Sequence, residues 1–232
     1  MPRALVIHHD ANSSLGLLGD ILRDEGYELV EHYVCTELNS PVATGPMPAL
    51  DDVDLVVPLG SRWSVYDRES IGNWVDDELD LLRAADERAI PVFGICFGGQ
   101  MLAAAHGATV EPAQQFEIGW LPVGRNDAAG FGDGPWFQWH LDRFDNPHGA
   151  TELARNYVGP QAFRLRRNLG VQFHPEVDRS VLDEWFSVDQ ADLLALGLDP
   201  DAVRRDTEEQ VDAARGRTAA LVRWFLRDVA TA

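Results

Sequence analysis

One short run of this chain has the residue types and spacing of a nucleophile. Cys96 lies in Gly94-Ile95-Cys96-Phe97-Gly98-Gly99-Gln100, between an apolar stretch with strand character and a helix-forming stretch that starts at Met101. The glycines allow close backbone approach and strained dihedral angles that other residues resist. A thiol in such a turn lies at a helix N-terminus, where free amides and the helix dipole favour a thiolate. The pattern therefore predicts a cysteine nucleophile.

A thiol nucleophile needs a base, and the base needs a partner that orients it. The chain has seven histidines, and only His174 both ends an apolar strand-like run and carries a carboxylate two residues later, in His174-Pro175-Glu176. Pro175 restricts the backbone of both neighbours, so Glu176 could reach the imidazole as the acid does in a Ser-His-Asp triad. The alternative is a core histidine at a strand end that is followed by a turn. The presence of Cys96 upstream favours the triad.

These side chains require elements that bring strand ends together. Strand-like runs at 5–8, 27–34, 53–59 and 92–95 alternate with helical patterns at 15–25, at 74–89 and after Cys96. This alternation is typical of a parallel sheet flanked by helices, which binds ligands at the carboxyl ends of its strands. His8, Gly60 and Cys96 fall at such ends.

The pattern changes after about residue 109. Short strand-like pieces at 108–111, 118–123, 136–140, 162–166 and 170–174 predict antiparallel strands beside the parallel core, and from residue 179 the chain is mostly helical, with a break near Gly197 and Pro200. We expect an α/β fold, a three-layer flavodoxin-like mixed sheet with a nucleophile elbow. We also expect one domain over residues 1–232, with a helical C-terminal segment from about residue 178.

Composition limits the classes of function. With 45% hydrophobic and 25% charged residues, the 232-residue chain resembles an ordinary globular protein. It has no apolar run long enough to span a membrane and no signal-peptide core, so we expect a cytoplasmic location. The formal net charge of -19 argues against nucleic acid and anionic membranes as partners. Two cysteines are too few for a disulfide framework, and Cys35 is expected to be a small buried hydrophobe.

Together, the two motifs resemble those of the class I, triad-type glutamine amidotransferases. The pattern G-x-C-x-G-x-Q is complete at residues 94–100, and H-P-E is complete at 174–176, with Cys96 and His174 78 residues apart (174 minus 96). The segments 64–67, 117–120, 137–140 and 161–164 resemble the stand-alone, GMP-synthase-like members of the same family. The resemblance extends from residue 4 to about residue 180.

The resemblance implies hydrolysis of glutamine to glutamate and ammonia, with no metal or other cofactor. Cys96 would attack the side-chain amide, His174 would protonate the departing ammonia and then activate water, and Glu176 would orient His174. Backbone amides of Phe97 and of the Gly60–Ser61 turn would hold the oxyanion. The residues implied to hold the substrate are Gln100, Glu117 and His140.

Two positions depart from the family pattern. Ser61 replaces a glycine of the oxyanion turn, and a Cβ would not fit there if the position required a positive φ. Leu141 replaces the glycine of the His-Gly-Asp sequence of many GMP synthetases. These departures keep a second hypothesis open, a catalytically weak regulatory or binding module. A third is a hydrolase of γ-glutamyl peptides or conjugates that uses the same triad.

Other signals are weaker. No phosphate-binding G-x-x-x-x-G-K-[ST] pattern occurs, so the ammonia acceptor requires a separate synthetase or acceptor-binding chain, unless the protein is a free-standing hydrolase. His8-His9-Asp10 is expected to be a loop at the sheet edge rather than a metal site, because adjacent strand residues point to opposite faces. Asp76-Asp77-Glu78 is expected to be a solvated helix face.

Overall fold

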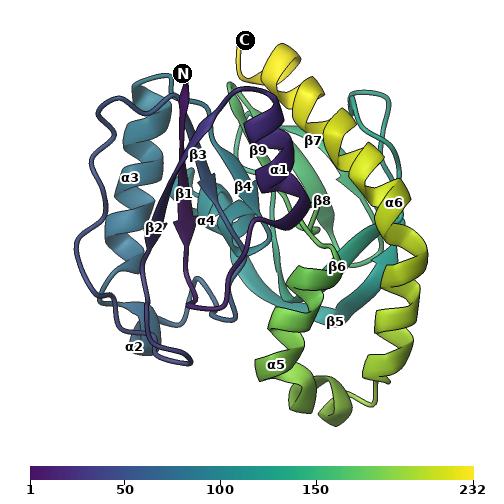
Figure 1. Ribbon diagram of the computed structural model, residues 1–232. Helices are drawn as coiled ribbons and strands as arrows, with labels where there is room; N and C mark the ends of the chain where they lie inside the picture. The colour runs from purple at the N-terminus through teal and green to yellow at the C-terminus, as the bar shows by residue number, and fades with distance from the viewer.

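A mixed sheet forms the centre of the molecule, as the computed structural model shows for residues 1–232 (Figure 1). Strands β1 and β4 pair in parallel with their neighbours, and an isolated parallel bridge between Val56 and Val92 joins the two halves of the sheet. Strands β8 and β9 are antiparallel, as are β7 and β8. The strand order is β2-β1-β3 in one half and β4-β9-β8-β7 in the other. The bounds are β1 (Arg3–His8), β2 (Glu28–Tyr33), β3 (Leu55–Pro58), β4 (Phe93–Ile95), β7 (Thr151–Arg155), β8 (Pro160–Leu165) and β9 (Asn168–Val171).

Helices cover both faces of the sheet (Figure 1). Side chains alternate along β1, so that Ala4 and Val6 share one buried cluster with α1 and α6, whereas Leu5 and Ile7 share another with α3 and α4. This arrangement gives three layers, as the sequence pattern predicts, and it places the carboxyl ends of β1, β3 and β4 at one edge. The helices are α1 (Gly16–Asp24), α2 (Arg68–Ile71), α3 (Val75–Glu87), α4 (Phe97–Ala105), α5 (Arg179–Ala195), α6 (Pro200–Trp224) and the π-helix η1 (Phe225–Val229).

A long antiparallel hairpin, β5 (Val110–Leu121) and β6 (Trp136–Phe144), lies beside the sheet and near α5 and α6 (Figure 1). The two separate strands predicted at 108–111 and 118–123 are therefore one strand, whose pairing shifts in register between Pro112 and Glu117. Strand β7 was not among the predicted elements. Phe137 of β6 packs with Val181 and Phe186 of α5 in a third buried cluster, which fixes α5 over the hairpin.

The expectation of a solvated face at 76–78 is wrong for one residue. Asp76 and Asp77 are exposed, but Glu78 is completely buried. Residues 75, 78, 79 and 82 follow helical spacing and share one side of α3, which packs against the core. The predicted break in the C-terminal helical segment is confirmed, because α5 ends at Ala195 and α6 begins at Pro200. No helix combines the length and the apolar character needed to cross a membrane.

Candidate active site

Cys96 occupies a strained turn between β4 and α4, with φ 51° and ψ -109°. A Cβ on Gly94 would lie 2.5 Å from the carbonyl oxygen of Gly98, and one on Gly98 would clash with the carbonyl of Pro58. The Cys96 amide donates to Val171 O at 2.8 Å and thereby ties the turn to β9. Such strain persists only where the surrounding structure over-determines it, and it concentrates at functional sites.

His174 and Glu176 form a buried pair beside this turn. His174 Nδ1 lies 2.7 Å from Glu176 Oε1, whereas His174 Nε2 has no hydrogen-bond partner. Burial alone lowers the pKa of His174, but the charges of Glu176 and then of Cys96 outweigh it and raise the pKa well above the ordinary value. An imidazole in this setting can accept a proton from the thiol.

Helices α1 and α6, from opposite ends of the chain, hold the His174-Pro175-Glu176 turn in place. The amide of Leu17, in the first turn of α1, donates to Glu176 O at 2.9 Å. Thr218 Oγ1 of α6 donates to Pro175 O at 2.7 Å. Gly16 has φ 40°, and a Cβ there would collide with the same Glu176 carbonyl, so glycine allows α1 to approach.

Three backbone amides near Cys96 are free to bind an oxyanion. Phe97 is the first residue of α4, where the amides have no acceptor inside the helix. The amides of Gly60 and Ser61 make no backbone hydrogen bond. Ser61 does not have a positive φ, so its backbone does not require glycine.

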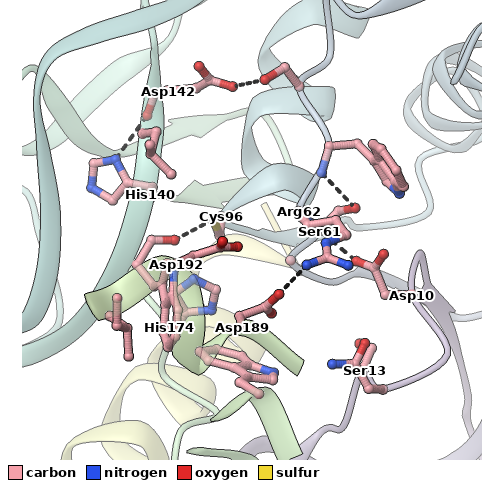
Figure 2. Close-up of a pocket in the computed structure, with 18 of the residues that line it drawn as sticks. Asp10, Ser13, Ser61, Arg62, Cys96, His140, Asp142, His174, Asp189 and Asp192 are labelled. Carbon is pink, nitrogen blue, oxygen red and sulfur yellow. Dashed lines mark hydrogen bonds and ion pairs between the residues drawn. The ribbon is translucent and has the colours of Figure 1, made fainter. Parts of the chain in front are cut away.

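A cavity of about 440 Å³ opens over these groups (Figure 2). Cys96, Gln100, Leu141 and His174 are among the residues that line it. Gln100 Nε2 donates to Gln172 Oε1 at 3.3 Å, and Gln172 Nε2 donates to Cys96 Sγ at 3.7 Å. The remaining lining comes from loops, from β6 and from α5, and it includes Asp10, Ser61, Arg62, Asp142, Trp185, Asp189 and Asp192.

Glu117, which the resemblance implies helps to hold the substrate, does not line the cavity but lies behind it, in contact with His140. Its role toward the substrate stays a prediction. Its carboxylate accepts from Asn156 Nδ2 at 2.7 Å, from Gln161 Nε2 at 3.0 Å and from His140 Nε2 at 3.1 Å. Although burial raises the pKa of Glu117, these bonds, that of His140 first, lower it below its ordinary value. His140 lines the cavity, but its two ring nitrogens face Glu117 and, at 2.9 Å, Asp142 O. Its ring can therefore shape the wall but has no free nitrogen for a ligand.

Sequence reasoning missed several groups around the cavity. Asp142 accepts from Ser64 Oγ at 2.5 Å and from Tyr66 OH at 2.7 Å, which ties the segment 64–67 to β6. Trp185 of α5 packs edge-on against His174, with ring centroids 4.9 Å apart. Arg62 forms an ion pair with Asp189, so the loop that contains the Gly60–Ser61 turn is linked to α5 (Figure 2). No local pattern in the sequence predicts contacts between residues that lie so far apart along the chain.

The two thiols differ in their surroundings, as expected. Cys35 is completely buried, and its burial raises the pKa of its thiol to about 11, which keeps it protonated and unreactive. Cys96 lines the cavity.

Comparison with known proteins agrees with this geometry. The family Glutamine amidotransferase class-I matches residues 53–187. A GMP synthase [glutamine-hydrolyzing] of Thermomicrobium roseum is 42% identical over 104 residues, 41% of this chain and 20% of that protein. One of Anaplasma marginale is 32% identical over 157 residues, 59% of this chain and 29% of that protein. The chain thus matches less than a third of the length of either relative.

The whole architecture also has a close counterpart. The crystal structure of a glutamine amidotransferase from Thermotoga maritima superposes with a TM-score of 0.84 at 28% identity, covering 98% of this chain and 99% of that one. This confirms the predicted fold class. The chain therefore belongs to the class I glutamine amidotransferases, a family of cysteine-dependent enzymes that hydrolyse glutamine and transfer its ammonia.

Proposed function

We propose that this chain hydrolyses L-glutamine to glutamate and ammonia through a Cys96–His174–Glu176 triad, within one amidotransferase domain over residues 1–232. The observation that carries the proposal is the buried His174–Glu176 pair, at 2.7 Å, which leaves Nε2 of His174 unpartnered beside Cys96. A base oriented in this way, next to a thiol at a helix N-terminus, is the arrangement that thiol acyl transfer needs.

In the first step the Cys96 thiol gives its proton to His174, and the sulfur attacks the side-chain amide carbon of glutamine. The carbonyl oxygen then carries negative charge, which the amides of Phe97 and of the Gly60–Ser61 turn stabilise. Collapse of this intermediate breaks the carbon–nitrogen bond. His174 donates its proton to the nitrogen, ammonia leaves, and a γ-glutamyl thioester remains on Cys96.

In the second step His174 takes a proton from water as the water attacks the thioester. The sulfur leaves with the proton that His174 returns, and glutamate is released. Glu176 keeps the imidazole oriented and compensates its positive charge throughout. Gln100 contributes to the substrate pocket, while Glu117 acts through its contact with His140.

The decisive experiment measures glutamine hydrolysis by the wild type and by Cys96→Ala. We expect ammonia release in the wild type and none above background in the variant, together with a covalent adduct on Cys96 when a glutamine-mimicking electrophile is added. Equal rates in both proteins would contradict glutamine hydrolysis at Cys96. If γ-glutamyl amides were not cleaved either, the result would favour the regulatory or binding module.

The destination of the ammonia is a separate question. The relatives named GMP synthase are much longer than the matched region, and we infer that this chain passes ammonia to a synthetase or acceptor-binding chain. Co-purification from the native source tests this inference. Full glutaminase activity in isolation, with no co-purifying partner, would instead indicate a free-standing hydrolase.

One observation favours γ-glutamyl conjugates as alternative substrates. The cavity volume of about 440 Å³ lies in the range of about 300–1,000 Å³ that accommodates drug-sized ligands, which are much larger than glutamine. Trp185, Asp189 and Asp192 of α5 contribute to its lining. Rates of ammonia release from glutamine and of cleavage of γ-glutamyl amides, measured side by side, distinguish the two substrate classes.

A further inference from the structure

A second buried histidine–carboxylate pair lies behind the proposed oxyanion turn. His9 follows β1 and Glu78 belongs to α3, and both side chains are completely buried. His9 Nε2 lies 2.9 and 3.0 Å from the two carboxylate oxygens of Glu78. From the sequence pattern alone we expected His9 in a loop and Glu78 on a solvated helix face. We propose that His9 and Glu78 are positioning residues that orient the oxyanion-binding amides, an inference that rests on the proposed function.

The geometry connects this pair to one oxyanion amide through a single peptide plane. His9 Nδ1 lies 3.3 Å from the carbonyl oxygen of Gly60. That carbonyl shares its planar trans peptide with the Ser61 N–H, and the two groups point in opposite directions. A hydrogen bond that holds the Gly60 oxygen on the His9 side therefore holds the Ser61 N–H on the other side.

The same imidazole contacts the second donor. Its ring packs edge-on against the Phe97 ring, with centroids 4.8 Å apart. Phe97 supplies the amide at the start of α4. One buried side chain thus contacts Gly60, whose carbonyl shares a peptide plane with the Ser61 amide, and Phe97, although these residues come from different strand–helix turns.

Glu78 stabilises the doubly protonated form of His9, which the proposed positioning of Gly60 requires. The Gly60 carbonyl and the Glu78 carboxylate are both acceptors, so each ring nitrogen of His9 must carry a hydrogen. Burial opposes this charge, but Glu78 outweighs it and raises the pKa of His9. Without the carboxylate the ring would become neutral and would lose one of its two N–H donors.

Stability alone is a weak reason for such a pair. Replacing a buried ion pair by apolar residues of similar volume is often neutral or stabilising, whereas removing one partner leaves a buried charge. Two variants therefore test the proposal, so that a result is obtained even if one of them fails to fold. Glu78→Gln keeps the shape and removes the charge, and the double variant His9→Phe/Glu78→Met keeps the packing and removes the hydrogen bond to Gly60.

The experiment compares two reactions of Cys96. Glutamine hydrolysis passes through an oxyanion, whereas alkylation by iodoacetamide does not. Because displacing a catalytic group by 1 Å can cost about 100-fold, we expect kcat to fall about 10- to 100-fold in both variants with KM almost unchanged. The alkylation rate should stay near the wild-type value. Cys35 is buried and protonated, so alkylation reports on Cys96 alone.

Asp86→Asn is the matched control, because Asp86 lies on the same helix and pairs with Arg166 away from the cavity. It should leave both reactions unchanged. An unchanged kcat in a folded variant, or a parallel loss of alkylation, would overturn the inference.

A crystal structure of the double variant gives a readout independent of turnover. We expect a rotated Gly60–Ser61 peptide, and an unrotated one would also overturn the inference. Absence of glutamine turnover in the wild type would instead reject the proposed function.

Discussion

A methyl group on Gly60 would lie 2.9 Å from Cε1 of His174 and 3.8 Å from Cβ of Cys96. Gly60 does not have a positive φ, so its backbone conformation is open to other residues. What excludes a side chain is the approach of the histidine. The oxyanion turn and the proposed base are therefore in van der Waals contact, and the size of residue 60 sets the distance between them.

We predict that Gly60→Ala lowers kcat/KM for glutamine about 100-fold, because His174 must move away from Cys96 to accommodate the methyl group. Steady-state kinetics measures the effect. Gly216→Ala is the matched control, since Gly216 is exposed in α6 and a Cβ there would have no other atom within 4 Å. It should raise the free energy of unfolding by about 0.5–1 kcal/mol and leave activity unchanged. Retention of activity by Gly60→Ala would contradict the contact.

A second prediction concerns the charge of His174. Glu176→Gln removes the main influence that raises the pKa of His174, so burial should then dominate and lower it below 6.5. NMR titration of His174 in a Cys96→Ala background measures this shift without interference from the thiol. With Cys96 present, Glu176→Gln should slow glutamine hydrolysis on the order of 100-fold or more.

Glu208→Gln provides the control for that substitution. Glu208 pairs with Arg179 on the surface, so its loss should change neither the titration of His174 nor the rate. An unchanged pKa of His174 in Glu176→Gln would show that Glu176 does not govern the proposed base.

A third prediction addresses the departure at position 61. Because Ser61 does not adopt a positive φ and its amide is free, Ser61→Gly should change kcat/KM for glutamine by less than about threefold. A gain of tenfold or more would mean that the serine impairs the oxyanion site and would favour the catalytically weak module. The measurement is the same steady-state assay.

Local motifs predicted the elbow and the His-Pro-Glu turn, because each motif is built from neighbouring residues whose spacing fixes its geometry. The burial of Glu78 could also have been predicted from the sequence, since its spacing from Val75, Leu79 and Leu82 places it on the buried side of α3. Because Glu78 belongs to a run of three acidic residues, all three were assigned to a solvated face in spite of this helical spacing. The pairing of Glu78 with His9 was not predictable, because 69 residues separate them and only the fold brings them together.

The substrate end of the cavity was less predictable for the same reason. Glu117, His140 and Gln161 form one buried network across β5, β6 and β8, and the sequence does not reveal which of them faces the cavity. The lining residues of α5 depend on how that helix packs over the β5–β6 hairpin. Neither relationship has a signature in local spacing.

The last prediction concerns His8, which points away from His9 and stacks on Tyr33 with ring centroids 4.3 Å apart. Burial, the largest influence, lowers the pKa of His8 from 6.5 to about 4. The unfolded chain therefore binds a proton near pH 6.5, whereas the folded chain binds it only near pH 4. Because protons favour the unfolded state in this window, stability that is present above pH 6.5 is lost as the pH falls toward 4.

The expected loss between pH 7 and pH 5 is about 2 kcal/mol of unfolding free energy. Urea unfolding at both pH values measures it, with His8→Phe as the variant that keeps the stacking on Tyr33 and cannot titrate. The wild type should lose about 2 kcal/mol more than His8→Phe, while the variant His148→Asn, at an exposed histidine, should follow the wild type. Equal losses in the wild type and His8→Phe would mean that His8 is protonated in the folded protein, through its neighbour Glu31 at 3.8 Å.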